Sequence, residues 1–121
     1  MLNLTQHIAT EDQLAAGVVE PTPGAKAAIK AALTFPDCPS KEQVLAAAKR
    51  LAEIAKAQKA KTVMIGGAPW FMAPLERALR AAGVEPVYAF SARESVDVKQ
   101  PDGSVRKTAV FRHAGFLPAI R

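Results

Sequence analysis

The sequence predicts an α/β fold: an open parallel sheet with flanking helices and a C-terminal β-hairpin. Two observations predict the sheet. Short apolar runs alternate with segments of helical periodicity, and residues 62–65 form the continuous apolar run expected of a central parallel strand. A third observation predicts the hairpin, because after residue 91 apolar side chains alternate with charged ones on either side of a Pro-Asp-Gly-Ser turn at residues 101–104.

Length and composition indicate one compact domain over residues 1–121. The chain is 50% hydrophobic, 22% charged and only 6% aromatic, so the core is built from small aliphatic side chains. One cysteine excludes a disulfide framework and leaves too few thiols for a zinc finger or an iron–sulfur site. No apolar run approaches the roughly 20 residues that cross a bilayer, and the N-terminus lacks the basic start of a signal peptide. We therefore expect a soluble, cytoplasmic protein.

The first third of the chain combines short strands with a capped helical turn. Residues 1–6 are expected to form a buried strand with Leu2 and Leu4 inward. Residues 10–13, Thr-Glu-Asp-Gln, match the capping box that opens a helix, and Gly17 ends this turn. Residues 18–19 are a candidate second short strand. Residues 25–33 then read as a helix because of their alanine content.

The middle of the chain alternates helix and strand. A second capping box at residues 40–43 opens a helix to about Gln58, whose apolar positions recur every three or four residues. The strand at residues 62–65 ends in Gly66-Gly67-Ala68-Pro69, and a helix follows to about Ala82. Pro74 is expected in its first turn or at a bend. Residues 87–90 form the next strand, and the appended hairpin covers about residues 94–113.

The net charge of +5 favours an anionic partner. Residues 87–121 carry six Lys or Arg against three Asp or Glu, so three of the five excess charges lie there. Binding of long duplex DNA usually neutralises many phosphates, which makes a small anion or a short oligonucleotide the better expectation.

Three segments are expected to converge at one end of the sheet, because ligands of open α/β sheets bind outside the carboxyl ends of parallel strands. They are residues 5–7 (Thr-Gln-His), 66–69 (Gly-Gly-Ala-Pro) and 91–94 (Ser-Ala-Arg-Glu). The two glycines let a phosphate approach the backbone at a helix N-terminus, although a plain tight turn explains them equally well. Trp70 and Phe71 beyond them belong either to the core or against a ligand base.

The third of these segments offers a hydroxyl, a guanidinium and a carboxylate close together. Arg93 is suited to hold a phosphate in a bidentate manner, while the alternative is a local surface pair between Arg93 and Glu94. His7 and His113 are candidates for a general acid or base, although a lone histidine is more often structural. On the predicted hairpin, alternation places Lys107, Ala109, Phe111 and His113 on one face. Two histidines without a carboxylate at ligand spacing predict no metal site.

These motifs, in this order, resemble a known family. They comprise Thr5-Gln6-His7 with the capping box, Gly66 to Pro69, Tyr88 to Glu94, the turn Asp102 to Val105, and Phe111-Arg112-His113-Ala114-Gly115-Phe116. Together they resemble the small stand-alone ring nucleases of type III CRISPR systems, which are related to the CARF (CRISPR-associated Rossmann fold) sensor domains. The resemblance runs along the whole chain and is weakest between residues 17 and 58.

The resemblance implies a Rossmann-like homodimer that binds a cyclic oligoadenylate, cyclic tetra-adenylate above all, and cleaves it without a metal or other cofactor. By analogy, Thr5, Gln6 and His7 line the pocket floor, and Gly66, Gly67 and Ala68 cradle phosphate. Ser91 and Arg93 bind the scissile phosphate, Glu94 orients Arg93 or a 2′-OH, and Lys107 and His113 reach the site from the hairpin. No lid other than the hairpin is evident in a chain this short. The alternatives are a nucleotide sensor that cuts nothing, a module that binds another phosphometabolite, and a structural partner that uses the hairpin as its contact.

Overall fold

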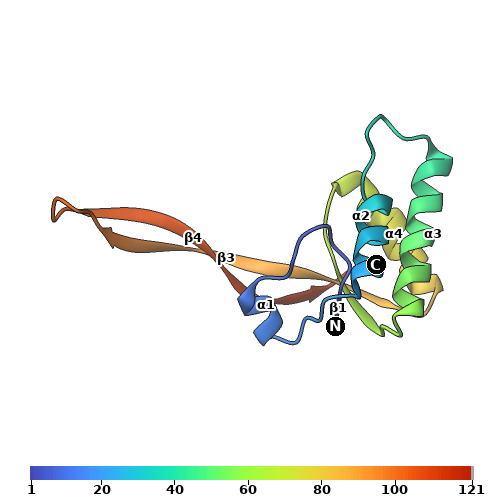
Figure 1. Cartoon of the computed structure of the whole chain (residues 1–121), viewed down its shortest axis with the longest axis horizontal. Helices are drawn as coiled ribbons and strands as arrows, with labels where there is room; N and C mark the ends of the chain where they lie inside the picture. The colour runs from blue at the N-terminus through green and yellow to red at the C-terminus, as the bar shows by residue number, and fades with distance from the viewer. Residues whose placement is uncertain (121) are drawn as a thin grey trace.

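The structure is a computed structural model and describes residues 1–120 (Figure 1). Its elements in chain order are β1 (Leu2–Asn3), α1 (Glu11–Ala15), α2 (Pro23–Ala32), α3 (Lys41–Ala57), β2 (Thr62–Ile65), α4 (Pro69–Ala81), β3 (Glu85–Lys99) and β4 (Val105–Pro118). The four strands lie in the order β1-β2-β3-β4; the first three are parallel, and β4 is antiparallel to β3. The predicted α/β class, the open sheet with its flanking helices, and the C-terminal hairpin are therefore confirmed.

The main core lies between one face of the sheet and the three longer helices, α2, α3 and α4, which stand together in Figure 1. Val63 and Ile65 of β2 point to this side and are buried with apolar residues of the helices. In α3 the buried face includes Ala48, Ala52 and Ala55, whose small side chains allow close packing against its neighbours. Among residues 1–120, no helix is both long and apolar enough to cross a membrane.

The opposite face of the sheet has a much thinner cover. Met64 of β2 points there and is buried with Ala9 and Val18, while Ala89 and Phe116 pack against this small cluster. The cover consists of α1 and the segments next to it, and α1 itself buries none of its residues. The predicted strand at residues 18–19 is present as one parallel bridge between Leu2 and Val19.

The largest difference from the prediction concerns β3. Residues 87–90 and the first hairpin strand were expected to be separate, but they are one continuous strand of 15 residues. β4 pairs with β3 from Val87, opposite Pro118, to Lys99, opposite Val105, so the strand does not stop at residue 91. The expected strand at residues 1–6 is shorter, and Pro74 lies inside α4, beyond its first turn.

The outer part of this hairpin, Ser91 to His113, extends beyond the body of the molecule, and we call it the arm (Figure 1). A β-bulge marks its base, because Phe90 pairs with Gly115 while Ser91 pairs with His113, which leaves Ala114 without an opposite residue. Cross-strand pairs show that Lys107, Phe111 and His113 share a face with Ser91 and Arg93, as alternation predicts.

Both predicted capping boxes are present, and they generate a test of how the two helices contribute to stability. Ser40 accepts a hydrogen bond from the backbone of Gln43, and Thr10 accepts one from the backbone of Gln13. We expect Ser40→Ala to lower the free energy of unfolding by about 1 kcal/mol, because α3 carries much of the core. Thr10→Ala is expected to cost clearly less, because α1 is short and buries nothing. Urea denaturation measures both, and an equal or larger loss for Thr10→Ala would contradict this reading.

Candidate functional site

A cleft of about 440 Å³ opens at the carboxyl ends of β1 and β2. Because the two strands are neighbours and parallel, the segments that follow them meet there. The lining residues are Thr5, Gln6, His7, Ile8, Thr10, Gln13, Met64, Ile65, Gly66, Gly67, Tyr88 and Ala89. The structure thus brings the first two predicted segments, Thr5 to His7 and Gly66 to Gly67, into one cleft.

The loop that forms the floor of this cleft is held from below by Asn3 of β1, which is completely buried. Its Nδ2 donates to the carbonyl of His7 (2.7 Å) and to Glu20 Oε1 (2.7 Å). Its Oδ1 accepts from the backbone N–H of Thr5 (3.0 Å) and from the Thr5 hydroxyl (2.7 Å). One amide side chain therefore defines the path of residues 5–7.

Lys26 of α2 and Glu20 complete this network. The Lys26 ammonium donates to the carbonyls of Thr5 (2.9 Å) and His7 (2.7 Å) and lies 3.5 Å from Glu20 Oε2. Glu20 Oε1 also accepts from the N–H of Ala9 (2.7 Å). Burial acts to raise the pKa of Glu20, but the hydrogen bonds from Asn3 and Ala9 and the charge of Lys26 outweigh it and hold the pKa below 4.5. Glu20 is therefore ionised at neutral pH and anchors the loop.

The two glycines shape the other wall. Gly67 has φ +147°, a backbone conformation that other residues rarely adopt, so its place in the turn depends on glycine. A Cβ at Gly66 would lie 3.8 Å from Thr5 Cγ2, which shows that its free side faces the cleft wall. Ala68 is the N-cap of α4 and does not line the cleft, and no side chain caps this helix. The start of α4 is thus left open beside the cleft.

The aromatic residues at the start of α4 belong to packing. Phe71 is buried in the main core, as one of the two readings expected. Trp70 is 53% exposed and makes edge contacts with Phe35 (ring centroids 5.4 Å) and Phe71 (6.0 Å). Neither residue lines the cleft.

The third predicted segment does not converge on the cleft. Ser91, Arg93 and Glu94 lie within β3 on the arm, because pairing with β4 carries the strand past the point where a loop was expected. The alternative of a local Arg93–Glu94 pair is also not formed: Glu94 accepts from Arg112 Nε at 2.7 Å, and Arg93 stands opposite Phe111. Successive residues of a strand point to opposite faces, which separates the two side chains.

The two histidines occupy different places. His7 lines the cleft, whereas His113 and Lys107 belong to the arm and do not. The His113 ring stacks at a tilt on Phe116 (centroids 4.6 Å apart), and its Nδ1 is buried without a hydrogen-bond partner. His113 pairs with Ser91 two residues beyond Ala89, so it stands just outside the cleft on the same face of the sheet.

The cleft is poor in positive charge. None of its lining residues is Lys or Arg, and the Lys26 ammonium beside the floor is bound to the carbonyls of Thr5 and His7 and to Glu20. The nearby exposed first turn of α1 instead carries Glu11 and Asp12. Among residues 1–120, no group of three or more His, Cys, Asp or Glu side chains is placed to hold a metal ion. An anion in this cleft would meet backbone N–H groups and His7, and any further cation has to come from elsewhere.

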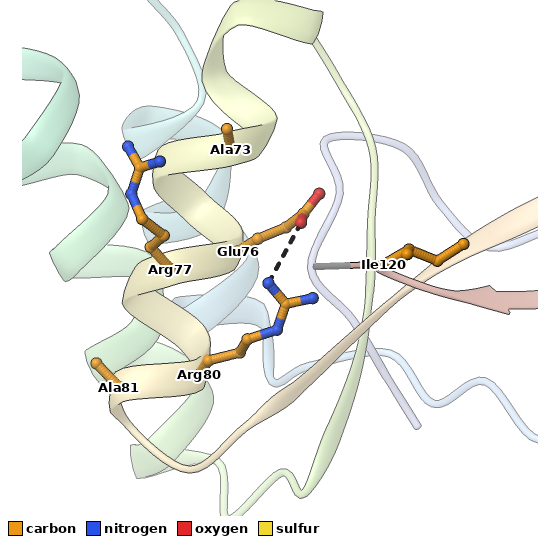
Figure 2. A pocket seen from close by; sticks show the side chains of 6 residues that line it. All are labelled: Ala73, Glu76, Arg77, Arg80, Ala81 and Ile120. Carbon is orange, nitrogen blue, oxygen red and sulfur yellow. Dashed lines mark hydrogen bonds and ion pairs between the residues drawn. The ribbon is translucent and has the colours of Figure 1, made fainter.

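A second hollow, of about 590 Å³, lies on the outer side of α4 (Figure 2). Arg80 donates to the carbonyl of Ala119 (2.6 Å) and lies 3.5 Å from Glu76, which in turn accepts from the Tyr88 hydroxyl. Burial and the neighbouring Glu76 carboxylate both raise the pKa of Tyr88. These groups join α4 to β3 and to the end of the chain, so we assign them a structural role.

Sequence reasoning did not identify the network of Asn3, Glu20 and Lys26 as part of the site. Its one visible signal is Asn3, a strongly polar residue between the two leucines of a short apolar strand. A buried asparagine in such a position needs partners for its donors and acceptors. Those partners are distant in sequence, and nothing in the residues themselves pairs Asn3 with Glu20 or Lys26.

A comparison with known families matches residues 1–117 to the model described as "Uncharacterized protein MJ1673 family", and the chain belongs to this family. The matched region contains both the cleft and the arm. No curated protein and no solved structure matches the chain.

The Lys26 contacts generate a direct test of how the cleft floor is held. We expect Lys26→Met to speed amide hydrogen exchange of residues 5–8, with a loss of about 1.5–3 kcal/mol in the free energy of local opening, because two charge-assisted hydrogen bonds disappear. Lys30→Met, one helical turn further on and exposed, is the matched control and should change nothing. Equal exchange in both variants would show that Lys26 does not hold the loop.

The ionised state of Glu20 predicts a pH dependence. Its pKa is lower in the folded chain than in the unfolded one, so its contribution to stability is present above about pH 4.5 and is lost as the pH falls through the folded value. Glu20→Gln should therefore flatten the acid limb of a plot of unfolding free energy between pH 6 and pH 3. The exposed Glu53 provides the control substitution, Glu53→Gln. Parallel acid limbs for wild type and Glu20→Gln would refute the role of this carboxylate.

Proposed function

We propose that this protein is a metal-independent ring nuclease that binds a cyclic oligoadenylate, cyclic tetra-adenylate above all, and converts it to linear products. In a cell with a type III CRISPR system, such an activity would switch off the antiviral signal that the ring carries. The proposal extends the resemblance drawn from the motifs, and one geometric observation carries it: the Thr5–His7 loop and the Gly66-Gly67 turn share one cleft.

Several properties of this cleft suit a nucleotide. It lies at the carboxyl ends of neighbouring parallel strands, where open α/β sheets bind ligands, and beside the uncapped start of α4. Its walls combine backbone at the glycines with the amide of Gln6 and the imidazole of His7. Pockets for drug-sized ligands measure about 300–1,000 Å³, and a ring of four nucleotides is larger than such a ligand. One cleft of about 440 Å³ would therefore hold part of the ring, which favours a homodimer with two clefts around a two-fold axis.

The proposed reaction draws its nucleophile from the substrate. A ribose 2′-OH attacks the adjacent 3′-phosphate, the bond from phosphorus to the 5′-oxygen breaks, and a 2′,3′-cyclic phosphate and a free 5′-OH result. The proton of the 2′-OH leaves to a base, and the 5′-oxygen gains one. His7 is the titratable imidazole in the cleft and is suited to this proton transfer. The protein's main task is to hold the 2′-OH in line with the scissile bond.

A nucleotide sensor without catalysis is the second candidate, and the position of Arg93 favours it. Binding needs the cleft alone, whereas cleavage benefits from a cation that stabilises the charge developing on the phosphate. Arg93 and Lys107 belong to the arm and lie outside the cleft of their own chain. Retained binding without cleavage would identify this second function.

The activity test uses the purified full chain with cyclic tetra-adenylate and EDTA. We expect linear di-adenylates with 2′,3′-cyclic phosphate ends, separated by chromatography. His7→Ala should lower the rate by about 10²–10⁴-fold, the range for loss of a general acid or base. A ring that stays intact for hours at micromolar protein excludes the nuclease.

Arg93→Ala tests the contribution of the arm to the same reaction. We expect a loss of about 10²–10³-fold in kcat/KM, as for other groups that stabilise transition-state charge. Arg106→Ala is the matched control, since Arg106 is an exposed arginine on the other face of the arm. Circular dichroism checks that both variants fold. Full activity in Arg93→Ala would remove this residue from the site.

A further inference from the structure

The arm has no partner within its own chain. Its two strands pair with each other, but the apolar side chains on it stay largely uncovered: Phe111 is 73% exposed and Val105 is 63% exposed. A lone two-stranded hairpin is marginally stable in water, and natural proteins cover or blunt long exposed strands. We therefore expect the arm to pack against a surface of another molecule.

The outer end of the arm cannot serve the cleft of its own chain. Ala89 of β3 lines the cleft, and Lys107 stands opposite Asp97, eight residues further along the same strand. At about 3.3 Å per residue this places Lys107 roughly 26 Å away along the strand, far beyond the reach of a lysine side chain. Continuous pairing between β3 and β4 keeps the arm extended, so its outer cations are directed away from the cleft of the same chain (Figure 1).

The net charge of the arm is opposite in sign to that of α1, which makes α1 of another copy the surface on which the arm would dock. The face of the arm that carries Phe111 also carries Arg93 and Lys107, against one acidic residue, Asp97. The exposed first turn of α1 carries Glu11 and Asp12, and α1 contains no basic residue. Apolar side chains are exposed beside both charged sets, at Ile8 and Leu14 near the cleft and at Val105 and Phe111 on the arm. Within one chain α1 contacts β4, but Lys107 near the outer end of the arm lies too far along the strand to reach the cleft beside α1.

We infer that the arm of each copy docks on α1 of a second copy and brings Arg93 and Lys107 to the rim of that copy's cleft. The contact is reciprocal, so two copies close around a two-fold axis and each arm gains a cover. The arm then adds cations to a cleft whose neighbouring ammonium, that of Lys26, is bound to Glu20 and to backbone carbonyls. The docking stands on charge, exposure and reach alone; only the identity of the anion held between arm and cleft rests on the proposed function.

A charge-swap experiment tests the docking without any ligand. One variant reverses the arm (Arg93→Glu with Lys107→Glu), and the other reverses α1 (Glu11→Lys with Asp12→Lys). All four side chains are exposed, so both variants should keep the wild-type circular dichroism spectrum. We expect wild type to sediment as a dimer of twice its 12.8 kDa chain mass, and each variant alone as a monomer. An equimolar mixture should regain the dimer, because each arm then meets an α1 of opposite charge.

The outcomes separate this arrangement from others. A wild-type monomer at 100 µM overturns the inference, as does a dimer that both reversals leave intact. Monomeric variants that do not recombine when mixed also overturn it, because they place the interface elsewhere. Capture of nucleic acid or of an acidic protein by a monomeric wild-type arm would assign the arm to another partner.

A complementation assay then tests whether the arm of one copy is needed for activity in the cleft of the other. His7→Ala removes the imidazole but leaves the cleft open to the ring, while Arg93→Ala with Lys107→Ala removes two cations of the arm. Each variant alone should be inactive on cyclic tetra-adenylate. Their mixture should regain up to one working site per mixed dimer, about a quarter of the wild-type rate, and a site built from one chain would regain nothing. If wild type itself cleaves no ring, the proposed function fails while the sedimentation result still decides the docking.

Discussion

The path of the Thr5–His7 loop depends on one buried side chain, Asn3. A completely buried amide in a two-residue strand loses its hydration, and it is tolerated only because all its contacts are satisfied by Thr5, His7 and Glu20. Glu20 is held in turn by Lys26 of α2. This polar network ties the thinly covered face of the sheet to the helical core, so the geometry of the cleft and the stability of the fold have a common origin.

Much of the fold follows from local patterns in the sequence. The capping boxes at Thr10 and Ser40, the apolar run of β2 and the proline and glycine around α4 each indicate an element that the structure contains. Two of the three predicted site segments also meet, because parallel neighbouring strands bring their carboxyl ends together. These features depend on neighbours in the chain or on the general geometry of a parallel sheet.

The features that escaped prediction depend on long-range pairing. A strand can end at Ser91 or continue, and the side chains there permit both. The pairing of β3 with β4, from Ser91 opposite His113 to Lys99 opposite Val105, makes it continue. The same pairing directs Glu94 to Arg112 instead of Arg93 and moves the third site segment out of the cleft. The lengths of exposed strands are therefore harder to predict than their presence.

The chemical groups suited to bind an anionic ligand lie in two separate regions of the molecule, the cleft and the arm. The cleft offers backbone, an amide and an imidazole but no Lys or Arg, and the arm offers cations and uncovered apolar side chains but no cavity. The proposed ligand, a symmetric anionic ring held between two copies, would contact both the cleft and the arm. The most direct measurement is calorimetric titration of the full chain with a 2′-fluoro analogue of cyclic tetra-adenylate, which has no attacking hydroxyl. The account predicts one ring bound per two chains, with binding abolished by Gly66→Leu. No binding, or binding that survives Gly66→Leu, would contradict it.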